Sequence, residues 1–368
     1  MAKRKTTKIC GIRIPVPQEI KKHLDQYVIG QEETKRILSV AVYNHYKKVV
    51  HNETHTSDSS RLDKSNIIIT GPTGSGKTLL VRTIAELLDV PYYIQDCTKI
   101  TASGYVGSDV EDCIAGLLRA CNYNVEMAQR GIVMLDEIDK IAKMDAGPSV
   151  TRDVSGECVQ QSLLKIVEGD VVGVQPQGGR KHPEQALTYV DTSNILFIAS
   201  GAFVGLEDLA RKRMEHGCNH IGFNTAQQRP LSDEEIKSYI NAEDIRRFGF
   251  IPEFVGRFPV ITTISKLEKD DLKRILVEPQ NAITRQYAEL LNMDNSELVL
   301  DPSAIDEIAS IAYNLGTGAR ALRNIVETVM TDIMFEAPGN IGKKNKVKIV
   351  INGETVREKT KKKFRLAS

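Results

Sequence analysis

Short apolar runs alternate with longer segments of helical periodicity through the first two thirds of the chain. Five of these runs are nearly continuous in apolar residues: 66–70 (NIIIT), 92–96 (YYIQD), 131–136 (GIVMLD), 194–200 (NILFIAS) and 259–264 (PVITTI). Strands show this pattern when both of their faces are buried, as in a parallel sheet with helices on either side. The pattern therefore predicts an α/β domain with a parallel five-stranded sheet covered by helices.

The pattern changes near residue 265, where amphipathic helical segments predominate and two short apolar runs (ELVLD and KVKIVI) indicate strands. We therefore expect a large domain over 15–264 and a smaller, mainly helical α+β domain over 265–352. Residues 1–14 are interpreted as a flexible basic lead-in. Residues 353–368 are rich in lysine and are interpreted as a charged, solvated tail.

Composition and charge narrow the classes of function. The net charge of +1 argues against a protein built chiefly to bind polyanions or membrane surfaces. The six cysteines form no C-x-x-C pair, which fits reduced thiols better than a disulfide framework or a zinc site. The sequence shows neither the apolar core of a secretory signal nor a run of membrane-spanning length. We expect a cytoplasmic protein that has no membrane partner.

A phosphate-binding motif follows the first apolar run. Residues 71–78 (GPTGSGKT) match G-x-x-x-x-G-K-[ST] in full, and a helical pattern comes next, as this motif requires. Its glycines let backbone N–H groups surround a phosphate, and the following helix N-terminus favours negative charge. Lys77 would reach the β- and γ-phosphates of ATP, and the Thr78 hydroxyl would ligate Mg²⁺. The predicted nucleotide-binding residues of this loop are Gly71, Pro72, Thr73, Gly74, Ser75, Gly76, Lys77 and Thr78.

An acidic pair ends the third apolar run. Asp136 and Glu137 lie 59 and 60 residues beyond Lys77, and the carboxyl ends of parallel strands share the crevice where ligands bind. Asp136 would hold the Mg²⁺, and Glu137 would polarise the attacking water. An acid-rich helix N-terminus would explain the same pair. The preceding buried strand and the phosphate motif favour the catalytic interpretation.

Several further motifs resemble the ClpX family of AAA+ protein unfoldases, the ATPase subunits of a bacterial compartmental protease. In chain order they are YVIGQ (27–31), GYVG (104–107), GGRKHP (178–183), IPEFVGR (251–257) and GTGAR (316–320). The resemblance runs from about Pro15 to Ile351. It implies a homohexamer that uses ATP and Mg²⁺ to unfold tagged proteins and feed them to a Clp-type peptidase, with no peptidase activity of its own.

The resemblance also implies roles at the nucleotide. Three apolar residues would line or border the adenine pocket: Val28, Ile29 and, as a weaker candidate near the hinge, Leu267. Arg257 would be the arginine finger, inserted into the site of a neighbouring subunit, where such a cation raises the rate about 10³–10⁵-fold. A surface arginine in a turn is the alternative for this residue. Arg320 resembles the sensor-2 arginine, and Ser200 stands where a sensor-1 polar residue is expected.

The remaining motifs concern substrate and partner. In this family the GYVG loop lines a central pore and its aromatic residue grips the polypeptide, although a packed turn is the alternative for Tyr105. The pore and entrance residues implied here are Tyr105, Val106, Thr151, Arg152, Val154, Arg180, Lys181 and His182. The apolar tripeptide Ile221, Gly222 and Phe223 lies in a long polar stretch and would dock on the peptidase ring.

One departure from the family is a missing zinc module. The family usually begins with four zinc-binding cysteines, whereas only Cys10 precedes residue 97 here, so no zinc is expected.

Other AAA+ unfoldases and other classes of ATPase are alternatives to this family. HslU shares a similar pore loop, but Ile195 comes only 59 positions after Asp136, which leaves little room for its inserted domain. A nucleic-acid motor needs a basic channel, whereas Asp109, Glu111 and Asp112 follow the predicted pore loop, so no nucleic-acid partner is expected. A stand-alone remodelling ATPase remains an alternative, and so does a scaffold without turnover, which the presence of Lys77, Glu137 and Arg257 disfavours.

Overall fold

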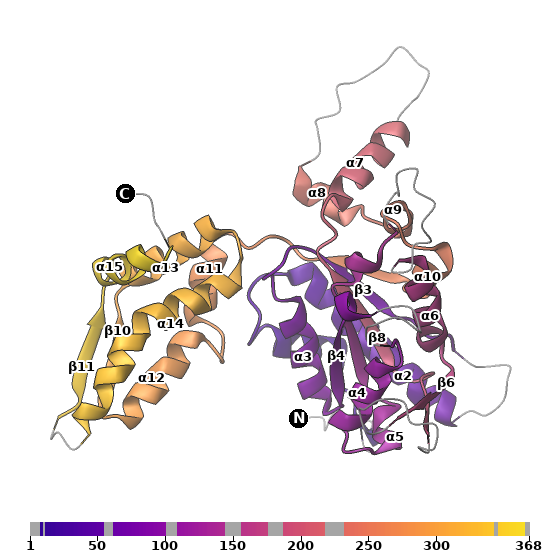
Figure 1. Ribbon diagram of the computed structural model, residues 1–368, viewed down its shortest axis with the longest axis horizontal. Helices are drawn as coiled ribbons and strands as arrows, with labels where there is room; N and C mark the ends of the chain where they lie inside the picture. Colours follow the sequence, from indigo (N-terminus) through magenta and orange to yellow (C-terminus); the bar gives the residue numbers. More distant parts are fainter. Residues whose placement is uncertain are drawn as a thin grey trace, which may run out of the picture. The chain divides into compact units, whose positions relative to one another are not determined.

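The structure is a computed structural model of the 368-residue chain. The described residues are 8–9, 12–54, 62–100, 109–143, 156–175, 187–217, 232–341 and 345–364. They form two compact units, called here the large unit and the small unit (Figure 1). The large unit consists of the chain through Lys21 together with Glu33–Pro72 and Val81–Ile264. The small unit consists of Lys22–Glu32, Thr73–Leu80 and the chain from Ser265 onward.

A parallel five-stranded sheet forms the centre of the large unit, in the order β4-β5-β8-β3-β9. Its strands are β3 (Ile67–Thr70), β4 (Tyr92–Asp96), β5 (Ile132–Asp136), β8 (Leu196–Gly201) and β9 (Val260–Thr263). Each strand lies within or closely overlaps one of the five apolar runs. All residues of β3 and β8 are buried, so both faces of the sheet are covered. The predicted α/β fold class is confirmed.

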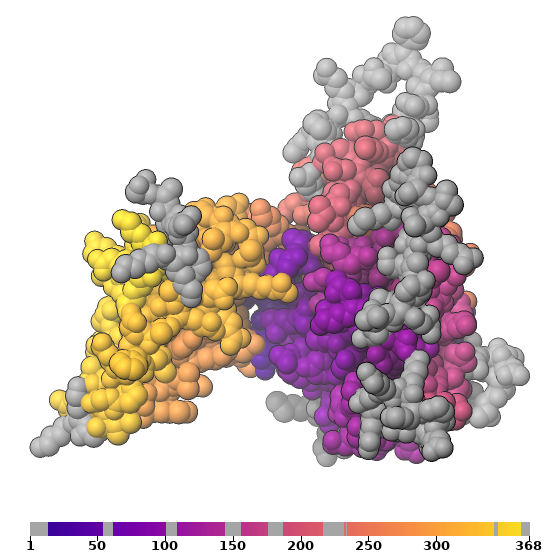
Figure 2. All heavy atoms as spheres, in the orientation of Figure 1, coloured from indigo at the N-terminus to yellow at the C-terminus, as the bar shows by residue number. Residues whose placement is uncertain are grey.

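Helices cover this sheet, and α4, for example, packs on β4 and β5. Figure 2, in the same orientation, shows their side-chain atoms. The described α-helices before Ser265 are α1 (Pro17–Leu24), α2 (Glu32–Thr54), α3 (Lys77–Leu88), α4 (Asp112–Ala120), α5 (Val125–Ala128), α6 (Glu157–Glu168), α7 (Leu206–Gly217), α8 (Asp233–Ser238), α9 (Ala242–Arg247) and α10 (Pro252–Gly256). Two 3₁₀ turns, η2 (Cys97–Lys99) and η3 (Ile138–Ile141), follow β4 and β5.

Two short antiparallel ladders lie outside the central sheet. One pairs β6 (Val171–Val174) with β7 (Thr188–Asp191). The other pairs β1 (Lys8–Ile9) with β2 (Ile12–Arg13). The second ladder lies in the segment 1–14, for which the sequence predicts a flexible basic lead-in. With two residues in each strand, this ladder is too short a pattern to recognise in sequence.

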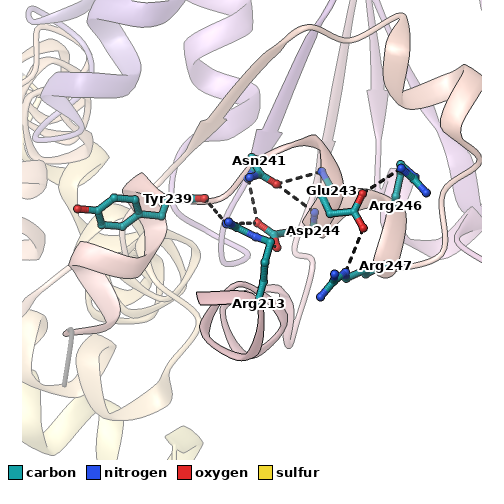
Figure 3. A network of polar contacts seen from close by, with 7 residues as sticks. All are labelled: Arg213, Tyr239, Asn241, Glu243, Asp244, Arg246 and Arg247. Atoms are coloured by element: carbon teal, nitrogen blue, oxygen red, sulfur yellow. Dashed lines mark hydrogen bonds and ion pairs between the residues drawn. The ribbon is translucent and has the colours of Figure 1, made fainter. Parts of the chain in front are cut away.

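A buried ion pair fixes the segment that leads toward α10 (Figure 3). Arg213 of α7 donates from Nε to Asp244 Oδ1 at 2.8 Å and from Nη2 to Asp244 Oδ2 at 3.0 Å. The same guanidinium donates to the carbonyl oxygen of Tyr239 at 2.7 Å. Asn241 caps α9, and Asp244 accepts from the Asn241 N–H in return. Because Asp244 is fully buried, these partners compensate its charge and hold α7, α8 and α9 together.

From Ser265 onward, the described part of the small unit packs five α-helices beside a two-stranded parallel sheet, as the predicted α+β domain requires. Its strands, β10 (Ser296–Leu300) and β11 (Val347–Ile351), pair in parallel. Its α-helices from Ser265 onward are α11 (Lys269–Val277), α12 (Ile283–Met293), α13 (Pro302–Leu315), α14 (Ala319–Glu336) and α15 (Gly353–Phe364), and the turn η4 (Ala337–Asn340) follows α14. Leucine, isoleucine and valine side chains of these elements form one apolar core.

Residues 353–364 are not the solvated tail that their charge indicates, because they form α15. Val356 and Thr360 are fully buried, and α15 packs against α13 and α14. On its flanks, Arg357 pairs with Glu307 at 2.8 Å and Lys359 pairs with Asp332 at 2.7 Å. Two buried positions four residues apart are enough to dock this helix, and the surrounding lysines hide them in the sequence.

His45 anchors α2 to the residue pair that precedes β8, and this contact makes the fold sensitive to pH. Its Nε2 donates to the carbonyl oxygen of Asn194 at 3.1 Å, and its side chain is buried. Burial, with a smaller contribution from the charge of Lys64, lowers the pKa of His45 from 6.5 to about 3. His45 stays neutral in the folded protein, whereas in the unfolded chain it takes up a proton as the pH falls below its usual pKa. Protonation of the unfolded chain therefore favours unfolding at low pH. This stability is therefore present above pH 6.5 and is lost as the pH falls toward 3.

We expect the wild-type protein to lose about 2 kcal/mol more unfolding free energy between pH 7 and pH 5 than a His45→Gln variant loses. Glutamine keeps an N–H donor for Asn194 but does not titrate. Urea unfolding of both proteins at the two pH values measures the difference. Equal losses in the two proteins would show that His45 is not the responsible group.

Candidate nucleotide site

The carboxylate of Asp136 is held at the carboxyl end of β5 by two donors. The Ser200 hydroxyl donates to Asp136 Oδ1 at 2.5 Å, and the Glu137 N–H donates to the same oxygen at 3.1 Å. Ser200 is fully buried in β8, the neighbour of β5 in the sheet. Charge-assisted hydrogen bonds of this kind are the stronger ones in proteins, so the orientation of this carboxylate is well determined.

The backbone turns sharply at Glu137. Its φ of 55° and ψ of 37° lie in the left-handed region, a backbone conformation that residues other than glycine, asparagine and aspartate rarely adopt. Strain of this kind collects at functional sites, where the surrounding structure enforces it. Here it places the exposed Glu137 side chain directly beside the fixed carboxylate of Asp136, at the N-cap of η3.

Asp139 joins η3 to the end of β8, a role that no pattern in the sequence predicts. Its buried carboxylate accepts from the Ala202 N–H at 3.1 Å. A Cβ at Gly201 would collide with the same carboxylate, so this close approach requires glycine. Nearby, burial raises the pKa of the Cys97 thiol well above its usual value, and the Cys113 thiol and the Asp136 carboxylate add to the shift. Cys97 therefore stays protonated and is a core residue.

The phosphate-binding motif leaves the carboxyl end of β3. The Gly71 N–H donates to the carbonyl oxygen of Gly201 at 3.2 Å, which fixes the start of the loop beside the end of β8. Gly71 has a φ of 141°, and a Cβ there would lie 2.6 Å from the carbonyl oxygen of Ile264. The motif ends in α3, which begins at Lys77. Ser75 and Lys77 are buried, and Thr78 is half-buried.

Within the small unit, the middle of this loop contacts the start of α14. The Ala319 N–H donates to the carbonyl oxygen of Gly74 at 3.0 Å. A Cβ on Gly74 would collide with the carbonyl group of Thr317, so glycine is required here as well. Arg320 is exposed and comes directly after Ala319. The structure thus brings the predicted sensor-2 arginine to the helix turn that binds the phosphate loop.

The three residues predicted for the adenine pocket also belong to the small unit. Val28, Ile29 and Leu267 are buried, with 5%, 6% and 6% of their surface exposed. Leu267 packs in the apolar core of this unit. Gln31, which was not singled out in the sequence, exchanges two hydrogen bonds of 2.9 Å with the backbone of Ser265. This amide pair fixes the YVIGQ segment at the point where the chain enters the small unit.

Arg257 follows α10 in the large unit. Its Nε donates to Glu168 Oε1 at 2.8 Å, and its Nη2 lies 2.7 Å from the same oxygen in an ion pair. The side chain of Arg257 is 54% exposed. Its neighbours Phe254 and Phe258 are fully buried, and their rings pack in a tilted arrangement with centroids 4.9 Å apart. Sequence patterns do not predict Glu168 as the partner, because the two residues are 89 positions apart.

Other predicted residues lie outside the described part of the chain. They are the pore and entrance residues Tyr105, Val106, Thr151, Arg152, Val154, Arg180, Lys181 and His182, and the docking residues Ile221, Gly222 and Phe223. In the described part, no cluster of three or more histidine, cysteine, aspartate or glutamate residues is arranged to hold a metal ion. No described helix has both the length and the apolar content needed to cross a membrane.

Two family comparisons cover most of the chain. Residues 62–261 match the AAA domain (Cdc48 subfamily), and residues 267–349 match the C-terminal, D2-small domain, of ClpB protein. The first match spans β3, β4, β5 and β8 with the phosphate loop, and the second spans α11, α12, α13 and α14 of the small unit.

Whole-chain relatives carry the name "ATP-dependent Clp protease ATP-binding subunit ClpX". The relative from Borrelia duttonii is 48% identical over 343 residues, which are 93% of this chain and 79% of that protein. The relative from Bacteroides thetaiotaomicron is 49% identical over 93% of this chain and 82% of its own length. The relative from Porphyromonas gingivalis is 50% identical over 90% and 79%. The chain therefore belongs to the ClpX family of AAA ATPases.

Proposed function

We propose that this chain forms a cytoplasmic homohexamer that hydrolyses ATP to unfold tagged proteins and pass them to a Clp-type peptidase. The observation that carries the proposal is the corner of β5, where a fixed Asp136 carboxylate precedes a left-handed Glu137. An acidic corner of this kind, after a buried strand and in a chain with a complete phosphate loop, supports hydrolysis of a nucleoside triphosphate. The names of the ClpX relatives support the link to the Clp protease.

The residues present fit Mg²⁺ and the phosphates of ATP. Magnesium prefers oxygen ligands and takes only one or two carboxylates from the protein in such sites, with phosphate oxygens and water completing its shell. Asp136 and the hydroxyl of Thr78 would supply oxygens of this type. Glycines at 71 and 74, where a Cβ would collide with backbone, leave the loop backbone free to approach phosphate. Bound Mg²⁺ would neutralise charge that develops on the phosphates.

Each remaining polar residue has a part in the proposed reaction. Lys77 would bind the β- and γ-phosphates, and Glu137 would orient and polarise the attacking water. Ser200 would keep the Asp136 carboxylate in the orientation that holds the metal. Arg257 would stabilise the transition state in a neighbouring copy, so turnover would depend on assembly. Arg320 would contact the phosphates from the first turn of α14.

The mechanical part of the proposal concerns the loops outside the described residues. Tyr105 and Val106, with Thr151, Arg152 and Val154, would contact an extended polypeptide in the pore. Arg180, Lys181 and His182 would attract the carboxyl terminus of a tagged protein. Ile221, Gly222 and Phe223 would dock on the peptidase. The free thiols of the described cysteines Cys97, Cys113, Cys121 and Cys158 agree with a reducing compartment such as the cytoplasm.

Replacing Ser200 with alanine tests the support of Asp136. A hydrogen bond to a charged group contributes roughly 1.5–3 kcal/mol, so we expect ATP turnover of Ser200→Ala to fall about tenfold or more. The matched control is Ser39→Ala, because Ser39 is also a buried serine and donates to the carbonyl oxygen of Lys35 within α2. Steady-state ATPase assays of both variants give the comparison. Equal turnover in the two variants would contradict a role for Ser200 at the metal.

Replacing Tyr105 with alanine tests the proposed function. We expect Tyr105→Ala to keep ATP turnover within about twofold of wild type and to slow unfolding of a tagged fluorescent protein about tenfold or more, because contact with the substrate is lost and the ATP site is not. Tyr105→Phe, which keeps the ring, should unfold normally.

Deleting Ile221–Phe223 provides the second control for this experiment. That variant should unfold the fluorescent protein but fail to deliver it to an added Clp-type peptidase. Unchanged unfolding by Tyr105→Ala would contradict the pore function and favour the packed turn.

A further inference from the structure

The guanidinium of Arg257 needs support from outside its own element. It follows α10, a helix of only five residues, which is too short to be stable alone. The buried rings of Phe254 and Phe258 anchor the backbone on either side of Arg257. They do not hold the long, half-exposed side chain, so polar contacts must orient it. Those contacts come from α6, which packs against α10 (Figure 1).

Gln160 of α6 connects two backbone segments by hydrogen bonds from one buried amide to three backbone groups. Its Nε2 donates to the carbonyl oxygen of Ile141 at 2.7 Å and to that of Gly249 at 3.2 Å. Its Oε1 accepts from the Ile251 N–H at 2.8 Å. Ile141 is the last residue of η3, the turn that follows Asp136 and Glu137, and Ile251 is the N-cap of α10. Gln160 therefore ties the acidic corner to the start of the helix that precedes Arg257.

A second contact joins the same two segments. The carbonyl oxygen of Gly249 also accepts from the Lys143 N–H at 2.9 Å. The carbonyl oxygen of Gly249, before α10, therefore accepts hydrogen bonds both from Gln160 and from the chain that follows η3. Because the side chain of Gln160 is fully buried, a movement of η3 must either move α6 and α10 or break a buried hydrogen bond.

Glu168 ends α6 and holds the side chain of Arg257 itself. Gln160 and Glu168 are eight positions apart, which corresponds to about 12 Å along the helix. Glu168 accepts a hydrogen bond from Nε and forms an ion pair with Nη2 through a single oxygen, Oε1. An arginine has five N–H donors in a rigid fork, so the remaining donors stay available for phosphate oxygens while the orientation is fixed.

We infer that Gln160 and Glu168 are positioning residues for Arg257, through which α6 links the acidic corner of one subunit to the arginine that the subunit offers to its neighbour. The inference rests on the proposed role of Arg257. It assigns to α6 a regulatory function, because the state of one nucleotide site alters hydrolysis at the next. The physical basis is one continuous series of contacts: η3, Gln160, α6, Glu168 and Arg257.

The first test uses Gln160→Met, which is similar in size and removes all three hydrogen bonds. Gln161→Met is the matched control, since Gln161 is the next residue of α6 and is exposed. A residue that acts through Arg257 supports only the transition state, so we expect kcat to fall about tenfold with KM for ATP unchanged. Gln161→Met should behave as wild type. A raised KM with normal kcat for Gln160→Met would overturn the inference.

The second test uses the exposed end of α6, where a substitution does not threaten folding. Glu168→Gln removes the charge that holds Arg257, and Glu157→Gln is its control. Glu157 is the first residue of the same helix and pairs with Lys143 at 3.2 Å, with a similar exposure of 41% against 39% for Glu168. We expect kcat to fall about threefold to tenfold for Glu168→Gln alone.

A double-mutant cycle separates this inference from the proposed function. Single-turnover hydrolysis, which remains measurable when slow, is compared for wild type, Arg257→Ala, each α6 variant and each combination. If the α6 residues act through Arg257, they cause no further loss in the Arg257→Ala background. Losses that multiply in that background would overturn the inference and leave the role of Arg257 intact. Normal hydrolysis by Arg257→Ala would overturn the proposed role of Arg257 and the inference with it.

Discussion

The hydrogen bond from Ser200 to Asp136 is the constraint on which the rest of the site depends. It joins the carboxyl ends of β8 and β5, and β8 also adjoins β3 on its other side. One residue later, the carbonyl oxygen of Gly201 accepts from Gly71, the first residue of the phosphate loop. Asp139 then holds η3 against the same strand end. A single strand thus sets the positions of the acidic corner and of the loop start, which explains why its residues are all buried.

Buried polar groups give this part of the fold one defined arrangement. Gln160, Asp244 and Ser200 are fully buried, and each has its hydrogen-bonding capacity met by named partners. Such groups cost free energy when any partner is lost, so alternative packings of the same apolar residues are disfavoured. The left-handed conformation at Glu137 is tolerated because this framework surrounds it.

The sheet and the phosphate loop were predictable, because their information is local. Apolar runs such as 194–200 mark buried strands, and the G-x-x-x-x-G-K-[ST] spacing carries its own mechanism. The contacts that organise the site were not predictable, because they join distant residues: 64 positions separate Asp136 from Ser200. The resemblance predicts Ser200 as the sensor-1 residue but does not predict that Asp136 is its hydrogen-bond partner. In α15 the lysine-rich sequence predicts a solvated tail and is wrong, because its lysines outnumber Val356 and Thr360, the two buried residues that dock the helix.

The central claim is that the corner of β5 activates water for ATP hydrolysis, and Glu137→Gln tests it most directly. Glutamine keeps the size of the side chain and the backbone donor to Asp136 but removes the base. The decisive measurement is ATP binding and turnover on the same protein sample. General-base catalysis contributes about 10²–10⁴-fold, so turnover should fall by at least about a hundredfold while the Kd for ATP stays near that of wild type. Turnover close to wild type, or loss of ATP binding with turnover, would contradict the account.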